Sequence, residues 1–370
     1  MTTSTNPPPA PAPEKQQPGA ATDRPESLPA RLLRVLLTQR IALLVLLLAV
    51  VLITMTTLSG NNYLSAPYDS SYLAATLINA VPLVLLGLAE LLVITSGRGG
   101  IDLSVGAIVS LTGMVFGFAY GEWGWSLFPA LVLAVAFGAL CGALNGVLVA
   151  YLGFPALITT LATYYAFSSL ALVINDQQPI NAEPIQEFYS TARAVEVPFL
   201  PDAVPAVPLG VFTYLVPAVV VIWLVMARTT YGRRLYAIGT NDVAAEWTGI
   251  DVRRTRFLAY VGAGALSGLV AVYTVAQFAS ARPDAGVAGN GMALPAITIA
   301  VLGGVAITGG IGRVAGVVLA TLLIVWLNAG ILLAVPGNAG TQFQLFALGF
   351  VLVFAALLNG FANRRYGGTS

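Results

Sequence analysis

Apolar stretches of about 20 residues alternate with short polar connections along most of the chain. A helix of about 20 apolar residues spans the hydrocarbon core of a bilayer and satisfies its own backbone hydrogen bonds there. The pattern therefore predicts an all-α polytopic membrane protein with about ten transmembrane helices. The expected spans are residues 41–58, 73–95, 101–120, 127–151, 156–174, 209–227, 257–278, 292–308, 314–335 and 343–361.

Three segments are longer or more polar than simple turns between spans. Residues 1–30 are rich in Pro, Ala and Thr without apolar periodicity, which predicts a disordered cytoplasmic tail ahead of a membrane domain at residues 31–366. Residues 175–208 are acidic and rich in proline, which predicts a stiff, irregular extracytoplasmic loop. Residues 229–256 are rich in arginine and lie between two spans, which predicts a cytoplasmic loop.

Basic residues are distributed unevenly between the two sides of the predicted bundle. With the N-terminus in the cytoplasm, fifteen of the 17 Lys and Arg residues fall on the cytoplasmic side, and Arg193 and Arg282 fall outside. Short cytoplasmic loops of membrane proteins carry such an excess of positive charge. The distribution supports the number of spans and predicts that both termini are cytoplasmic.

The arginine-rich loop has a helical pattern of its own. Asn241 or Asp242 can cap a short helix that begins in the sequence VAAEW, and Gly249 can end it. A short helix between two spans on the inner face is suited to contact a cytoplasmic partner. A solvated turn with positively charged anchors explains the same pattern without a partner.

Two acidic residues, Glu90 and Asp102, fall at or near membrane depth, where a charge is costly unless it faces the bundle interior or a wet cavity. Glu90 can serve a polar pathway or an ion-coupling site, or it can make a structural hydrogen bond or pair with Arg98. Asp102 can cap the following helix, although a polar helix start beside a transport path would look the same. Asn145 and Thr159 can line such a path or make packing hydrogen bonds.

Composition excludes several function classes. The chain is 57% hydrophobic and 9% charged, with a net charge of +1, so nothing indicates a nucleic-acid partner; membrane lipid is the expected surrounding. One cysteine and no histidine rule out a disulfide framework and a His-based catalytic triad, and no ligand cluster suggests a metal site. The chain has no GxxxxGK[ST] sequence, so any ATP-hydrolysing motor must be another polypeptide. We expect no catalytic residues and no cofactor.

Two glycine-rich segments resemble each other. GGIDLSVG at residues 99–106 and GGIGRVAG at residues 309–316 share Gly-Gly-Ile and a later Gly at the same spacing. Both are expected to join an inward-running span to an outward-running one. They indicate either an internal repeat of the kind found in transporters or the general recurrence of glycine turns in membrane bundles.

Three sequence motifs in order resemble the permeases of bacterial ABC importers for ribose-type monosaccharides. They are GGIDLSVGAIVSLTG, YGRRLYAIGTNDVAAEWTGIDVRRTR and LPAITIAVLGGVAITGGIGRVAGV. The resemblance extends over the whole membrane domain, although Arg98 is an added base beside the first motif. On this resemblance the ATPase-coupling residues are Gly239, Thr240, Asn241, Ala244, Ala245, Glu246, Gly249 and Ile250, and the signature or pathway residues are Glu90, Gly99, Gly100, Asp102, Ser104, Gly106, Asn145 and Thr159.

The resemblance implies the architecture and the partners of an importer. The expected fold is that of type II ABC importers for vitamins and siderophores, in the bacterial inner membrane. The expected partners are a cytoplasmic ABC ATPase, a second permease copy in a homodimer or heterodimer, and a periplasmic or lipid-anchored sugar-binding protein. Residues 229–256 would then be the coupling loop. Substrates of such permeases include pentoses, hexoses, polyols and a furanose-like signalling molecule. Two alternatives stay open, a branched-chain amino-acid ABC permease and an ion-coupled secondary transporter using Glu90 and Asp102.

Overall fold

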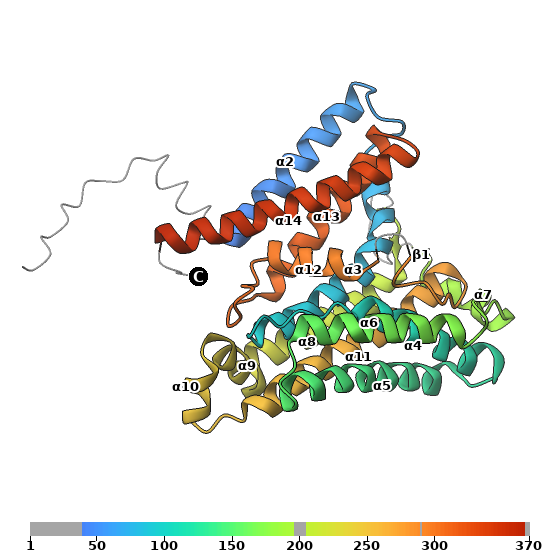
Figure 1. Cartoon of the computed structure of the whole chain (residues 1–370). Helices are drawn as coiled ribbons and strands as arrows, with labels where there is room; N and C mark the ends of the chain where they lie inside the picture. Colours follow the sequence, from blue (N-terminus) through green and yellow to red (C-terminus); the bar gives the residue numbers. More distant parts are fainter. Residues whose placement is uncertain (1–38, 196–204, 289–290, 367–370) are drawn as a thin grey trace, which may run out of the picture.

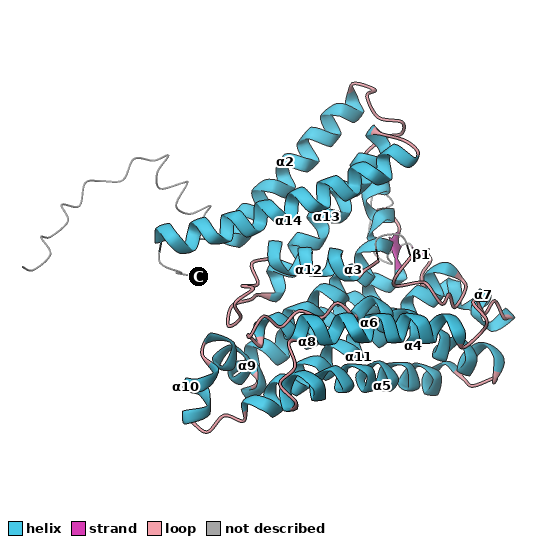
Figure 2. Ribbon diagram, in the orientation of Figure 1, coloured by secondary structure: helices cyan, strands magenta, loops and turns pink. Residues whose placement is uncertain are grey.

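Helices make up nearly all of the computed structural model, which describes residues 39–195, 205–288 and 291–366 (Figure 1). One short antiparallel strand pair accompanies them (Figure 2). The predicted tail, residues 1–30, lies outside the described residues. The elements are α2 (Arg40–Gly60), α3 (Ser70–Thr95), α4 (Val105–Phe116), η1 (Gly117–Glu122), α5 (Leu127–Gly146), η2 (Val147–Tyr151), α6 (Ala156–Val173), α7 (Glu183–Phe188), η3 (Tyr189–Thr191), β1 (Ala194–Val195), β2 (Val207–Pro208), η4 (Val211–Leu215), α8 (Val216–Arg228), α9 (Thr230–Thr240), α10 (Asp242–Trp247), α11 (Val252–Phe278), α12 (Ala293–Leu302), α13 (Val314–Ala334) and α14 (Asn338–Tyr366).

Among the described residues, eight helices are long and apolar enough to cross a membrane. Several combine two elements, for example α4 with the π-helical η1, and η4 with α8. The two other expected spans correspond to α12, which has 10 residues, and to α14. The prediction of a polytopic helical membrane protein is thereby confirmed.

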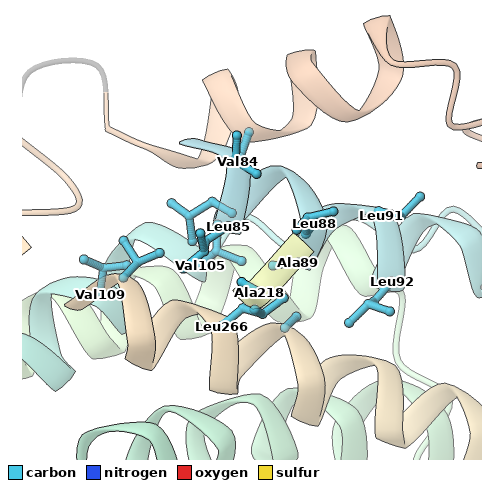
Figure 3. Close-up of a cluster of buried hydrophobic side chains, with 14 of the residues drawn as sticks. Val84, Leu85, Leu88, Ala89, Leu91, Leu92, Val105, Val109, Ala218 and Leu266 are labelled. Carbon is cyan, nitrogen blue, oxygen red and sulfur yellow. The ribbon is translucent and has the colours of Figure 1, made fainter. Parts of the chain in front are cut away.

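Helix α3 is the centre of the bundle. Nearly every residue from Ala80 to Thr95 is buried, and α3 packs against α11 on one side and against α12 and α13 on another (Figure 1). Its leucines meet side chains of α4, α8 and α11, among them Leu266 (Figure 3). Burial against other apolar chains gains little over lipid, so close packing is what holds these helices together.

Helices α5 and α11 show how close that packing becomes. A Cβ on Gly138 would overlap the backbone of Gly264, and a Cβ on Gly142 would overlap the carbonyl oxygen of Tyr260. Gly264 in turn leaves its own Cβ position only 2.8 Å from the Cα of Gly142. Small residues therefore bring these two helices together, and no larger residue fits at these positions.

Two helices are shorter than the expected spans because glycine turns replace their ends. Helix α4 begins at Val105 rather than at residue 101, since the preceding turn contains Gly97 with φ 81°. Helix α12 ends at Leu302 rather than at residue 308, where Gly304 takes φ 89°. Positive φ costs least for glycine, so the glycines favour both turns; Arg98 in the first turn also takes a positive φ, of 56°.

Two connections are more regular than the sequence predicts. The described part of residues 175–208 contains α7, η3 and the β1–β2 pair, in which Ala194 lies opposite Pro208. The expectation of an irregular loop is therefore wrong for this part. Residues 229–256 contain two helices rather than one, because α9 buries Leu235 and Ile238 while Arg233 and Arg234 stay exposed. That amphipathic spacing is the helical signal that the prediction missed.

Candidate functional site

Short polar side chains set the ends of the helices in the arginine-rich loop. Thr229 caps α9 by accepting from the N–H of Gly232 at 3.2 Å. Asn241 caps α10 by accepting from the N–H of Ala244 at 3.0 Å, which decides between the two cap candidates. Gly249 follows α10 with φ 81°. The prediction of a capped short helix closed by glycine is confirmed.

Helix α10 presents an apolar surface to its surroundings. Val243 and Trp247, one turn apart, are 58% and 87% exposed. The opposite face carries Ala245, which is buried in the main core. These two apolar side chains are therefore left without a packing partner within the subunit, on a loop that is otherwise mostly polar.

Some of the expected coupling residues lie on this exposed surface, and others lie where α10 joins the rest of the subunit. Asn241, Ala244, Glu246 and Gly249 are exposed, as is Thr240, while Gly239 and Ile250 are partly covered. Only Ala245 is buried among them. The set is brought together in space, but its members do not share one face.

Gly239 lies where three segments meet at the root of α10. A Cβ there would overlap the carbonyl oxygen of Thr95 and the amide nitrogen of Gly310. The N–H of Gly310 donates to that same Thr95 oxygen at 3.0 Å. The Tyr236 hydroxyl donates to the carbonyl oxygen of Gly312 at 2.7 Å, and burial raises the pKa of Tyr236, which keeps it a neutral donor. The two glycine-rich turns therefore both contact the end of α9.

Asp242, the first residue of α10, pairs with two arginines. Its Oδ2 contacts Arg98 Nε and lies 3.6 Å from Arg256 Nη2. The suggested pair between Glu90 and Arg98 is not found among the described residues; Arg98 is engaged by Asp242 instead. Sequence reasoning did not select Asp242, Arg256 or Trp247 as site residues, because nothing local distinguishes Asp242 from the other two acids of this loop, Glu246 and Asp251.

A buried chain of polar side chains extends from the first glycine turn into the bundle. Asp102 Oδ1 accepts from the Ser104 N–H at 2.9 Å and from the Ser104 hydroxyl at 2.6 Å. Asn145 of α5 donates to the Ser104 hydroxyl at 2.7 Å, and Thr163 of α6 donates to Asn145 Oδ1 at 2.8 Å. Asp102 thus holds the N–H just before α4 rather than one within it, so the expected cap is met only in part.

The other pathway candidates lie beside this chain or at its start. Glu90 Oε2 accepts from the Asp102 N–H at 3.4 Å, while Glu90 Oε1 has no hydrogen-bond partner among the described residues. Thr159 donates to the Pro155 carbonyl oxygen of its own helix. Of the signature and pathway residues, Gly99 is exposed, and Glu90, Gly100, Asp102, Ser104, Gly106, Asn145 and Thr159 are buried within the subunit.

Comparison with known proteins places this geometry in a family. Residues 72–356 match the family described as the branched-chain amino acid transport system permease component. The chain belongs to this permease family. The exposed short helix and the glycine turns are therefore features of a transport permease. No solved structure matches the permease.

Curated relatives of the permease include ABC transporter components. The probable ABC transporter permease protein y4mJ of Sinorhizobium fredii is 31% identical over 288 residues, covering 77% of this chain and 80% of the relative. The autoinducer 2 import system permease protein LsrD of Yersinia enterocolitica is 34% identical over 233 residues, covering 63% and 68%. LsrD of Photorhabdus temperata is 33% identical over 275 residues, covering 72% and 77%. The ion-coupled alternative for Glu90 and Asp102 finds no support among these relatives.

Proposed function

We propose that the chain is the permease subunit of an ATP-driven ABC importer that moves a monosaccharide or related carbohydrate across the bacterial inner membrane. The family match and the LsrD relatives support the class of transporter. The observation that carries the mechanism is the exposed pair Val243 and Trp247 on α10. The permease moves substrate and performs no covalent chemistry, so ATP hydrolysis belongs to a separate ATPase subunit.

The proposed arrangement follows the distribution of charge. Ten spans, completed by α12 and α14, form a type II importer fold with both termini and α10 in the cytoplasm, supported by the clustering of basic residues on that side. A second permease copy, identical or related, lies beside the first. A periplasmic or lipid-anchored sugar-binding protein docks at the opposite end, on residues 175–208 among others. Substrate passes between the two permease copies.

Helix α10 inserts into the cytoplasmic ATPase and receives its movement. A tryptophan that is free in the permease and enclosed in the complex is the residue type that contributes most to such interfaces. Glu246 precedes Trp247 in the sequence and is exposed, and it would lie at the polar rim of this interface with the ATPase.

The test of this contact is Trp247→Ala in the permease co-expressed with its ATPase. We expect an affinity for the ATPase that is weaker by about tenfold or more, with normal membrane insertion, measured by titrating labelled ATPase onto permease in nanodiscs. Trp125→Ala is the matched control, because Trp125 is also an exposed tryptophan but lies in the turn between η1 and α5. Equal ATPase affinity for Trp247→Ala and wild type would reject α10 as the contact.

The substrate class has one competitor, because the family description names branched-chain amino acids. The LsrD relatives are named for autoinducer 2 import, which favours a carbohydrate-like substrate. Proteoliposomes containing the assembled importer can be offered labelled monosaccharides and labelled leucine. We expect ATP-dependent accumulation of a monosaccharide. Accumulation of leucine alone would reject the carbohydrate substrate in favour of a branched-chain amino acid.

A further inference from the structure

The N-terminal end of α10 is tied by charge to two other segments. Asp242 forms ion pairs with Arg98, from the turn between α3 and α4, and with Arg256, from the second turn of α11. Arg256 Nη2 also donates to the carbonyl oxygen of Ser96 at 3.2 Å, so its guanidinium bridges α10 and the 96–104 turn. One carboxylate and two arginines thus join the distant 96–104 turn to α10 and α11, which follow each other in the chain.

The two ion pairs differ in burial. The side chain of Arg256 is 4% exposed and that of Asp242 is 17% exposed, whereas Arg98 is 68% exposed. A buried pair is costly to break because the remaining charge is left without a partner, while an exposed pair contributes little. The link through Arg256 therefore dominates, and the link through Arg98 is secondary.

The backbone is also closely packed just before α10. Gly239 precedes α10 and contacts Thr95, the last residue of α3, and the Cβ position of Gly97 lies 3.0 Å from the Cα of Gly239. The end of α9, from which α10 continues, is therefore packed closely against the end of α3 and the 96–104 turn. That turn carries Asp102, from which the buried hydrogen bonds lead through Ser104 and Asn145 into α5 and α6.

We propose that the ion pairs of Asp242 with Arg256 and Arg98 transmit the displacement of α10 to the 96–104 turn, and through it to the helices that move during transport. Asp242 and Arg256 are positioning residues: neither touches substrate or nucleotide. The inference rests on the proposed function, because it assigns the residues through which ATPase movement reaches the bundle.

The experiment measures substrate imported per ATP hydrolysed by the assembled importer in proteoliposomes. Arg256→Gln is expected to lower this ratio about tenfold while the ATPase still binds and hydrolyses ATP. Arg254→Gln is the matched control, because Arg254 lies two residues before Arg256 on α11 with an exposed side chain. Loss of the ratio without loss of ATPase binding distinguishes transmission from simple misfolding, which would remove both.

Arg98→Gln keeps the proposal testable if Arg256→Gln fails to fold, and a double variant tests whether Asp242 and Arg256 act through one link. Arg98→Gln alters an exposed side chain and is expected to lower the ratio about twofold to threefold. The double variant Asp242→Asn with Arg256→Gln should lose no more than the worse single variant, because both remove the same link. Ratios of wild-type size in Arg98→Gln and in folded Arg256→Gln, or losses that multiply in the double variant, would overturn the proposal. A wild-type importer without ATP-dependent uptake would instead overturn the proposed function.

Discussion

The two glycine turns, residues 97–106 and 303–316, share the sequence Gly-Gly-Ile but contact different parts of the bundle. Both approach Gly239, since a Cβ on Gly97 or on Gly309 would press on its backbone. The first turn continues into Asp102 and a buried hydrogen-bonded chain that reaches α5 and α6. The second continues into backbone packing, where Gly316 lies against Gly303. Glycines therefore allow both turns to pack closely against Gly239. The residues that follow these glycines determine which helices each turn contacts.

The largest expected effect comes from Gly239→Ala, which acts at once on the end of α3, just before the first turn, and on the second turn. The added Cβ would overlap Thr95 and Gly310, both through backbone atoms that cannot rotate away. We expect a destabilisation of about 3 kcal/mol or more and a loss of folded permease, measured by size-exclusion chromatography of detergent extracts. Gly349→Ala is the control, because nothing lies within 4 Å of its Cβ position. Equal yields from the two variants would show that the turns are not packed as described.

The same clash explains why a bulky residue at Gly239 is a poor probe of ATPase contact. Such a variant damages the bundle before it affects any partner, and Ala245 has the same defect because it is buried. Trp247 is the better probe, since its side chain makes almost no contact within the subunit. Gly239 and Ala245 therefore pack α10 against the bundle, whereas Trp247 is exposed on its outer surface.

Sequence periodicity predicted most of the helices because each span must satisfy its backbone within lipid. The cap at Asn241 and the stop at Gly249 were predictable for the same local reason. The ends of α4 and α12 were not, because positive φ at glycine depends on what packs against it. Nor could the Asp242 ion pairs be read from the sequence, since they join residues up to 144 positions apart through tertiary contacts.

A smaller effect is expected from breaking the polar chain of the first turn alone. Asn145→Leu keeps the volume but removes the donor to the Ser104 hydroxyl and leaves the Thr163 hydroxyl only the carbonyl oxygens of its own helix. We expect a cost of about 2 kcal/mol, measured as a fall in the thermal unfolding midpoint in nanodiscs. Thr321→Val is the control from α13, because that buried hydroxyl bonds only to the Val317 carbonyl of its own helix. An equal fall for both variants would mean that the chain adds nothing to packing.

The smallest effect is expected at the second turn, where Tyr236→Phe removes one hydrogen bond and no volume. The Tyr236 hydroxyl donates to the Gly312 carbonyl oxygen. Losing this single hydrogen bond should lower the free energy of unfolding by about 1 kcal/mol. Tyr63→Phe, at a residue 73% exposed, should cost nothing measurable in the same thermal unfolding assay. Because the first turn holds its helices through several linked hydrogen bonds and the second through backbone packing, Tyr236→Phe should stay well below Asn145→Leu. A reversed order would place the polar connection of the bundle on the second turn instead.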